Sequence, residues 1–223
     1  MSDILESMRR IFVPIHREGY PFIVIGLVLA LGLGHWVWEP LGWIFAILTL
    51  WVCYFFRDPV RVTPMRDGLV VSPADGRVSL IVTAVPPAET GLAAEPMTRI
   101  SVFMNVFDCH VNRYPLDGRV AYRHYNAGRF GHAGAEKASL SNEQASVGLD
   151  TPQGKVLVRQ IAGLVARRIV TDHEVGTDVR QGERMGMIRF GSRVDLFLPP
   201  GTRTLVQVGT KTRAGVTVVA EWN

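Results

Sequence analysis

The chain has 223 residues, of which 48% are hydrophobic and 20% are charged, with a formal net charge of +4 and a mean hydropathy of +0.17. This composition excludes a disordered protein and predicts one folded domain with at most a short appendage. Cys53 and Cys109 are the two cysteines, so a disulfide scaffold or a cysteine-built zinc site is disfavoured. The basic excess is modest and lacks long Lys/Arg runs, which disfavours nucleic acid as a partner.

The first quarter of the chain contains two apolar runs, Tyr20–Trp38 and Leu41–Phe56, separated by Glu39-Pro40. A bilayer core needs about 20 helical residues, so the first run is long enough and the second is marginal. Because proline interrupts a continuous helix, the sequence predicts a helical hairpin over residues 1–56. We expect this hairpin to associate with a membrane. Insertion into one leaflet, and burial in a soluble core, stay open as alternatives.

Positive charges flank the predicted hairpin and are absent from its connecting loop. The flanking arginines are Arg9, Arg10 and Arg17 before the first run and Arg57, Arg61 and Arg66 after the second. Cytoplasmic segments are enriched in Lys and Arg, so both ends are predicted to face the cytoplasm. The expected location is therefore the cytoplasmic face of the inner cell membrane, where the positive flank would attract anionic lipid.

After the second apolar run, short β-branched stretches alternate with Gly, Pro, Asp and Asn, which predicts a mostly β domain over residues 57–223. The predicted strands are Val70-Val71, Val78–Val82, Ile100–Phe107, Val156–Ile161 and Val165–Val170. Arg193–Leu198 alternates polar and apolar residues, the pattern of a half-buried strand. A short helix is predicted only near Ala133–Gln144.

An eight-residue motif occurs twice, at Val175–Gly182 and again 33 residues later at Val208–Gly215. Each copy has Val-Gly-Thr, then a polar stretch containing arginine, then glycine. Two such turn-strand units favour quasi-symmetric hairpins in one compact sandwich or barrel. A chance match of so short a motif is the alternative.

Three short segments combine reactive side chains with turn residues. They are Ser72–Gly76, Phe103–Pro115 and Ile188–Asp195. Each has an ordinary structural explanation, namely a tight turn, a hydrogen-bonded core histidine and a β-bulge. Together, Asp75, His110 and Ser192 could supply an orienting group, a base and a nucleophile. The histidines lack metal-ligand spacing, and no metal site is predicted.

The order and spacing of several motifs resemble the phosphatidylserine decarboxylase family, specifically its short bacterial and archaeal form. The motifs are Phe56–Pro59, Ser72–Gly76, Phe103–Pro115, Asn126–Phe130, Lys137–Ser139 with Asn142-Glu143, Gln160–Gly163 with Ala166–Ile169, and Phe190–Arg193. The resemblance covers roughly Phe56 to Trp222. It implies a barrel-sandwich-type β domain, similar to lipoyl and biotinyl domains, preceded by the helical hairpin.

The resemblance also implies an activity, the decarboxylation of phosphatidylserine to phosphatidylethanolamine and CO2. In the family, the precursor cuts itself at a Gly-Ser bond, which corresponds here to Gly191–Ser192 and would give a β chain 1–191 and an α chain 192–223. Ser192 would become a covalent pyruvoyl group that forms a Schiff base with the substrate. The family's other catalytic residues map to His110 and Asp75, and a homodimer of αβ units is expected.

Three arginines, Arg57, Arg113 and Arg193, are candidates to bind the phosphate or carboxylate of the substrate. Two departures from the family pattern affect the site. Many relatives have Leu-Gly-Ser-Thr at the cleavage site, where this chain has Phe190–Arg193. Longer relatives often have a second histidine where this chain has Arg113, so His110 would serve alone or share the work with water or Arg113.

Three alternative functions remain open. The substrate could be an archaeal-type serine ether lipid. The chain could instead be a membrane-anchored hydrolase that uses Ser192, His110 and Asp75 without cleavage. A lipoyl-like binding or scaffold module tethered by the hairpin is the non-enzymatic alternative.

Overall fold

The computed structural model describes residues 13–90, 92, 95–128, 142–163, 168–189 and 192–222. Contacts divide the chain into two compact units, Met1–Val60 and Arg61–Asn223. Most of the helix predicted near Ala133–Gln144 lies outside the described residues, and Gln144 itself begins a strand.

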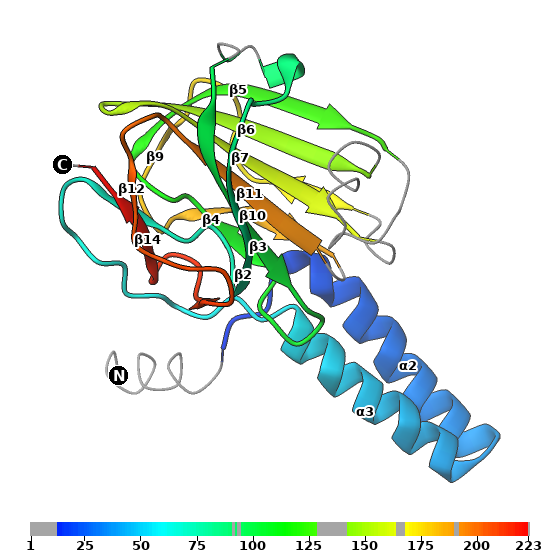
Figure 1. Ribbon diagram of the computed structural model, residues 1–223. Helices are drawn as coiled ribbons and strands as arrows, with labels where there is room; N and C mark the ends of the chain where they lie inside the picture. Colours follow the sequence, from blue (N-terminus) through cyan, green and yellow to red (C-terminus); the bar gives the residue numbers. More distant parts are fainter. Residues whose placement is uncertain are drawn as a thin grey trace, which may run out of the picture. The chain divides into compact units, whose positions relative to one another are not determined.

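The N-terminal unit contains a helical hairpin (Figure 1). A short 3-10 turn, η1 (Arg17–Gly19), leads into α2 (Tyr20–Trp36), which is followed by α3 (Glu39–Phe55). The predicted break at Glu39-Pro40 is the first turn of α3, where proline is tolerated because an N–H there has no intrahelical acceptor. The helices approach closely at a glycine pair, since a Cβ added to Gly42 would lie 2.6 Å from the Cα of Gly34.

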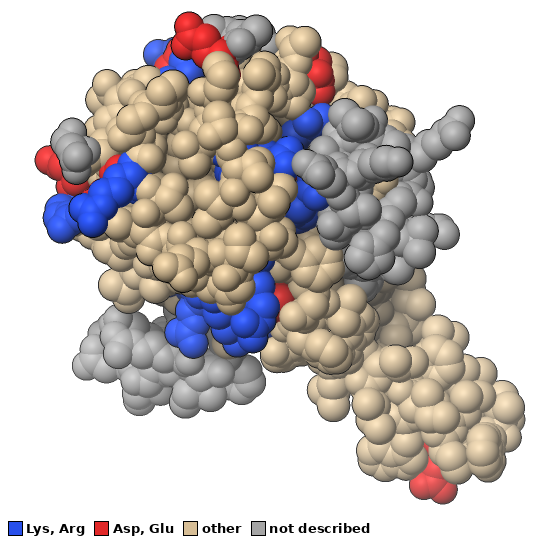
Figure 2. All heavy atoms as spheres, in the orientation of Figure 1, with Lys and Arg blue, Asp and Glu red and all other residues tan. Residues whose placement is uncertain are grey.

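The hairpin presents apolar side chains such as Leu31, Ile47 and Leu50 at its surface. Figure 2 draws almost all of the hairpin in tan, the colour of residues other than Lys, Arg, Asp and Glu. No residue of α2 is buried, and α3 buries only Gly42, Thr49 and Phe55. Among the described residues, the 20-residue helical segment Arg17–Trp36 is long and apolar enough to cross a membrane. The second helix, α3, is also apolar but has 17 residues, fewer than the about 20 that a bilayer core needs.

The C-terminal unit is mostly β and is built on a curled, eight-stranded antiparallel sheet with the order β13-β2-β3-β11-β7-β6-β5-β9 (Figure 1). Its strands are β2 (Gly76–Ala84), β3 (Met97–Met104), β5 (Gly118–Asn126), β6 (Gln144–Thr151), β7 (Gly154–Ala162), β9 (Asp178–Val179), β11 (Ser192–Leu198) and β13 (Lys211–Thr212). The sequence prediction of a β domain preceded by a helical hairpin is confirmed.

Two three-stranded sheets complete this unit, with the orders β4-β10-β8 and β1-β14-β12. Their strands are β4 (Val111–Arg113), β8 (Ile169–Thr171) and β10 (Arg184–Ile188), then β1 (Leu69–Val71), β12 (Arg203–Thr204) and β14 (Val218–Glu221); a 3-10 turn, η2 (Ala88–Thr90), precedes β3. Alternate residues of the large sheet, such as Val102, Val158 and Val194, pack with Met185 and Ile188 of β10 in one core. The face of the large sheet that carries these residues is called the inner face below.

The strand predicted at Arg193–Leu198 is confirmed as part of β11, but the prediction that it is half-buried is wrong, because all seven residues of β11 are buried. Polar and apolar residues do alternate along β11, but both faces of the strand are covered by other parts of the protein, so neither face meets solvent. Arg193 and Asp195 lie on the outer face and form an ion pair of 2.9 Å there. On the same face, Phe197 packs in a second apolar cluster with Leu157 and partly buried Leu92.

The sequence repeat corresponds to two equivalent turn-strand units at opposite edges of the large sheet. In both copies the first glycine, Gly176 or Gly209, has a φ of +92°, which glycine adopts without steric cost. Thr177 N–H donates to Glu174 O in one turn, and Thr210 N–H donates to Gln207 O in the other. The strands that follow are β9, paired with β5, and β13, paired with β2.

Candidate active site

Antiparallel pairing brings one end of several strands of the large sheet together. Ser192, the first residue of β11, pairs with Met104 at the end of β3 and with Ala162 at the end of β7. β2 begins at Gly76, and the next residue, Arg77, pairs with Phe103. The turn that contains Asp75 and the strand that begins with Ser192 therefore flank the end of β3 from opposite sides.

Ser192 is completely buried on the inner face of the sheet. Strand alternation places its side chain on the same side as Val194 and Leu196, which belong to the main core. Within the described residues its Oγ has no hydrogen-bond partner. An unpaired buried hydroxyl costs about 1–3 kcal/mol, so its retention at this position calls for a functional explanation. Gly191, the other residue of the predicted cleavage bond, lies outside the described residues.

His110 is also completely buried and lies at the corresponding end of the β4-β10-β8 sheet. Its backbone carbonyl accepts a hydrogen bond of 3.2 Å from Ile188 N–H at the end of β10. Its ring Nδ1 lies 3.0 Å from the backbone carbonyl of Asp108. Because a carbonyl can only accept, this contact fixes the proton on Nδ1 and leaves Nε2 as the acceptor of the neutral ring.

Three polar contacts join the ends of these two sheets. Asn112 of β4 accepts a hydrogen bond of 2.8 Å from Gln160 of β7 and donates one of 3.7 Å to the sulfur of Met104. At the other side, Ile169 N–H of β8 donates to Glu143 Oε1 at 3.3 Å. Ser192 on β11 lies between the strands that carry Met104 and Gln160, and His110 directly precedes β4, the strand that carries Asn112. The structure therefore brings Ser192 and His110 to one end of the sandwich.

The chain path limits their separation as well. Ser192 is four residue steps along the chain from Ile188, whose N–H contacts the His110 carbonyl. Four extended residues span at most about 14 Å, so the serine stays close to the histidine's end of the small sheet.

Asp75 lies at the same end of the domain. The segment before it runs antiparallel to β4, with hydrogen bonds of 2.9 Å from Val71 N–H to Pro115 O and from Arg113 N–H to Pro73 O. Its carboxylate accepts hydrogen bonds of 2.7 Å from Arg61 Nη2 and from Ala214 N–H. These contacts tie the turn before β2 to the chain before β1 and to the C-terminal turn, while the Asp108 carbonyl orients the histidine.

The three arginines predicted to bind substrate lie in three different environments. Arg57 belongs to the N-terminal unit, where its Nη1 donates to Tyr54 O at 2.6 Å and its guanidinium stacks 3.8 Å from the centre of the Tyr54 ring. Arg113 Nη1 donates to Gly182 O at 2.8 Å. Arg193 pairs with Asp195 on the outer face, on the opposite side of the sheet from the Ser192 side chain.

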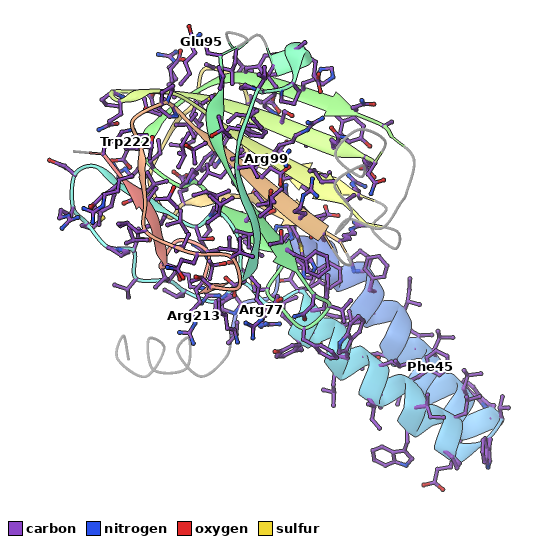
Figure 3. All side chains as sticks on the ribbon, in the orientation of Figure 1. Phe45, Arg77, Glu95, Arg99, Arg213 and Trp222 are labelled. Carbon is purple, nitrogen blue, oxygen red and sulfur yellow. The ribbon has the colours of Figure 1, made fainter. Side chains whose placement is uncertain are left out.

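The outer face collects several buried charges around Arg159 of β7. Arg159 bonds Glu89 at 3.1 Å and also contacts Gln144, and Arg99, labelled in Figure 3, comes from β3 on the same face. Burial lowers the pKa of the Arg159 guanidinium; Glu89 and Asp195 raise it, whereas Arg193 and Arg99 lower it further. Arg193 therefore belongs to a charged cluster that holds the outer face.

Sequence reasoning missed the groups that join the two sheets, Asn112 and Gln160, and the carbonyl of Asp108. A signal for the first two was present, because each is a polar residue inside a short strand-like stretch that otherwise suits burial. Buried amides require partners, so two of them in separate strands predict one another. A backbone carbonyl carries no comparable signal, since every residue has one.

The fold and this end of the sandwich define a class, a β-rich domain with a buried serine and a buried histidine at one end, preceded in the chain by an apolar helical hairpin. A model of the phosphatidylserine decarboxylase family matches residues 48–220. Because the match extends over most of the chain, the protein belongs to the phosphatidylserine decarboxylase family. Its activity is that of a phosphatidylserine decarboxylase, an enzyme of phospholipid biosynthesis with a phospholipid substrate.

Proposed function

We propose that the chain cuts itself between Gly191 and Ser192 and then decarboxylates phosphatidylserine, with a pyruvoyl group, at the cytoplasmic face of the membrane. The products are a β chain 1–191, an α chain 192–223 and, after turnover, phosphatidylethanolamine and CO2. One observation carries the proposal. A fully buried serine whose Oγ has no partner among the described residues begins a strand at the same end of the sandwich as a buried histidine.

Self-cleavage begins when Ser192 Oγ attacks the Gly191 carbonyl while His110 Nε2 accepts the hydroxyl proton. The peptide C–N bond breaks as an ester C–O bond forms, and the freed nitrogen takes up a proton. Loss of the Ser192 Cα proton then expels the Gly191 carboxylate and leaves a dehydroalanine residue. Water converts this residue to a pyruvoyl group and ammonia. The Asp108 carbonyl supports this assignment because a proton held on Nδ1 makes Nε2 the basic nitrogen of the neutral ring.

The environment of Ser192 fits a pyruvoyl group. The residue is fully buried, and its strand neighbours are Met104 and Ala162, so a small uncharged carbonyl group suits this position better than an unpaired hydroxyl. When formed, the pyruvoyl carbonyl supplies an electron sink for the pair left by departing CO2. His110 provides the proton that completes the product, and the buried surroundings exclude competing water.

Asp75 acts as a positioning residue in this scheme. Its carboxylate holds Arg61 and the Ala214 amide, and so fixes the turn that lies beside the end of β4. The apolar hairpin confines the enzyme to the surface where its lipid substrate resides. Arg57, Arg61 and Arg66 follow the hairpin and would favour an anionic lipid over the zwitterionic product. The proposed assembly is a homodimer of αβ units.

Intact mass of the purified protein tests the proposal. We expect two chains, with the smaller one blocked to Edman sequencing and labelled by an amine together with borohydride. A hydrolase would remain a single chain and would be labelled at Ser192 by a fluorophosphonate. A single chain with an unmodified serine and full lipid turnover would overturn the proposal. Parallel assays with phosphatidylserine and a serine ether lipid decide between the two substrates.

A further inference from the structure

A groove of about 550 Å³ lies at the edge of the large sheet and has no part in the scheme above. One wall comes from β5 and β6, whose positions Figure 1 shows, and the other from β8 and the residues around it. Its lining includes Arg123, Tyr125 and Ala145 on the first side and Arg168, Ile169 and Thr171 on the second.

The groove lies at the Ser192 end of the sandwich. Ser192 pairs with Ala162, and Ala162 N–H donates to Glu143 O at 2.9 Å, so these three residues occupy one row across adjacent strands. Two strand spacings place the Glu143 backbone about 10 Å from that of Ser192. Glu143 Oε1 accepts hydrogen bonds from Tyr125 Oη at 2.8 Å and from Ile169 N–H at 3.3 Å, and both donors belong to lining residues.

The two arginines of the groove differ in their engagement. Arg123 is held by Glu174 at 2.7 Å, by the His173 carbonyl at 2.8 Å and by the Thr171 hydroxyl, so its charge is already compensated. Arg168 is exposed, and across the described parts of the chain its guanidinium has no hydrogen bond or ion pair. Its backbone carbonyl accepts a hydrogen bond of 3.2 Å from Arg189 N–H, which anchors this cation beside the segment that leads to Ser192.

The charge of Arg168 also acts inside the groove. Partial burial and the hydrogen bond to Glu143 raise the pKa of the Tyr125 hydroxyl, whereas Arg168 lowers it. The cation of Arg168 at the groove and the buried carboxylate of Glu143, which lies behind the lining residues Tyr125 and Ile169, therefore follow one another toward Ser192. This order is complementary to a phosphate followed by an ammonium group.

We propose that the groove binds the phosphodiester of the lipid head group, with Arg168 as its direct cationic contact. The inference rests on the proposed function, because it takes the substrate amine to react at the Ser192 position. Four bonds separate that amine from the phosphorus, a span of about 5 Å. With the reach of the arginine side chain added, this span is comparable to the spacing of about 10 Å between the Ser192 and Glu143 backbones. The phosphate then lies at Arg168 while the ammonium group passes Glu143.

The test measures steady-state kinetics of full-length, self-cleaved enzyme on phosphatidylserine in mixed micelles. Arg168→Gln should raise KM about 10-fold or more while kcat changes less than about 3-fold, since a charge-assisted contact to phosphate is lost. Arg168→Lys should show a smaller rise, because it keeps the charge without the two-pronged geometry. Arg180→Gln is the matched control, an exposed arginine at the opposite end of the sheet, and should leave KM unchanged.

A second arm identifies the bound group. On a phosphatidylserine whose phosphate is blocked as a methyl triester, wild type and Arg168→Gln should have equal KM values. Inorganic phosphate should inhibit wild type competitively and inhibit the glutamine variant at least about 10-fold more weakly. An unchanged KM for Arg168→Gln, or an equal loss on diester and triester, overturns the inference. Inhibition by phosphate without a KM effect on the lipid would mean that the groove binds free phosphate, and would overturn it too.

The failure of this inference is distinguishable from failure of the proposed function. If wild type forms two chains and releases CO2 while Arg168→Gln retains its KM, only the head-group assignment is wrong. If wild type stays uncut and inactive, the proposed function itself is wrong. Should the glutamine variant fail to fold, Arg168→Lys decides, since an unchanged KM in that variant overturns the inference and a raised one restricted to the diester supports it.

Discussion

Gln160 Nε2 donates a hydrogen bond of 2.8 Å to Asn112 Oδ1, and both side chains are fully buried. Gln160 lies on β7, the strand that pairs with β11, and Asn112 lies two residues after His110 on β4. This one contact therefore joins the strand beside Ser192 to the strand that follows His110. Because both amides are inaccessible to water, neither can replace its partner cheaply.

Gln160→Leu should lower the free energy of unfolding by about 1–3 kcal/mol, because it leaves the Asn112 carbonyl oxygen without its donor. Self-cleavage should slow as well, since the two sheets lose a bridge next to the site. Time-resolved gel analysis of freshly synthesised chains measures the processing rate. Gln153→Leu, at an exposed position before β7, is the control. Processing of Gln160→Leu at the wild-type rate would show that this bridge does not position the serine and histidine.

Ser192→Ala should give an uncut, inactive chain of full mass. The free energy of unfolding should not fall and should rise by up to about 1–3 kcal/mol, because within the described residues the buried Oγ has no hydrogen-bond partner. Ser101→Ala is a close control, since Ser101 is also fully buried on the adjacent β3 with an unpaired Oγ, but on the outer face. That variant should self-cleave normally. Normal two-chain processing in Ser192→Ala would exclude the proposed cleavage bond.

His110→Ala should slow both self-cleavage and decarboxylation, because one ring nitrogen is proposed to accept the first proton and to supply the last. Removing a general base typically costs about 10²–10⁴-fold in rate. Added imidazole should restore part of the processing rate if the cavity left by the ring admits it. His35→Ala, which removes an exposed ring of α2 outside the β unit, should retain both activities. Wild-type rates in His110→Ala would remove this residue from the mechanism.

Asp75 and Arg61 should be energetically coupled, because their ion pair of 2.7 Å is largely shielded from water. In an uncut Ser192→Ala background, we expect Asp75→Ala to lower the free energy of unfolding by about 2–3 kcal/mol and Arg61→Ala to lower it by about 1 kcal/mol. The effect at Asp75 is larger because that substitution also removes the acceptor of the Ala214 N–H. The double variant should lose about 1 kcal/mol less free energy of unfolding than the sum of the two single-variant losses. Thermal unfolding in detergent measures each term, and strict additivity would contradict a direct coupling.

How far the sequence predicts this structure depends on whether the signal is local. The hairpin, β1, β2 and β7 follow from apolar runs and β-branched residues, and the repeat follows from glycines that need positive φ at the same place in two turns. The error at β11 has a non-local cause. Polar-apolar alternation reports two different faces, but it cannot tell whether the polar face meets solvent or a second layer that pairs Arg193 with Asp195.

The sequence predicts the three residues of the candidate site but not the groups that hold them in place. Ser192, His110 and Asp75 carry recognisable motifs, and the fold brings them to one end of the domain. Which carbonyl orients the histidine, and what the aspartate holds, depend on backbone positions that no side-chain pattern encodes. The arginine nearest the serine in sequence faces the other side of the sheet, because neighbouring residues in a strand point in opposite directions.

Deleting residues 1–56 separates the chemistry from the membrane. The β unit, Arg61–Asn223, has its own core and sheets, so we expect the truncated chain to fold and to cut itself at a rate close to that of the full chain. Turnover of phosphatidylserine in vesicles should fall steeply, because the enzyme no longer resides on the surface that holds its substrate. Turnover of a short-chain, water-soluble phosphatidylserine should stay within about 3-fold, since its head-group contacts come from the β unit. Self-cleavage serves as the folding control, and a truncated enzyme with full vesicle activity would contradict the anchoring role of the hairpin.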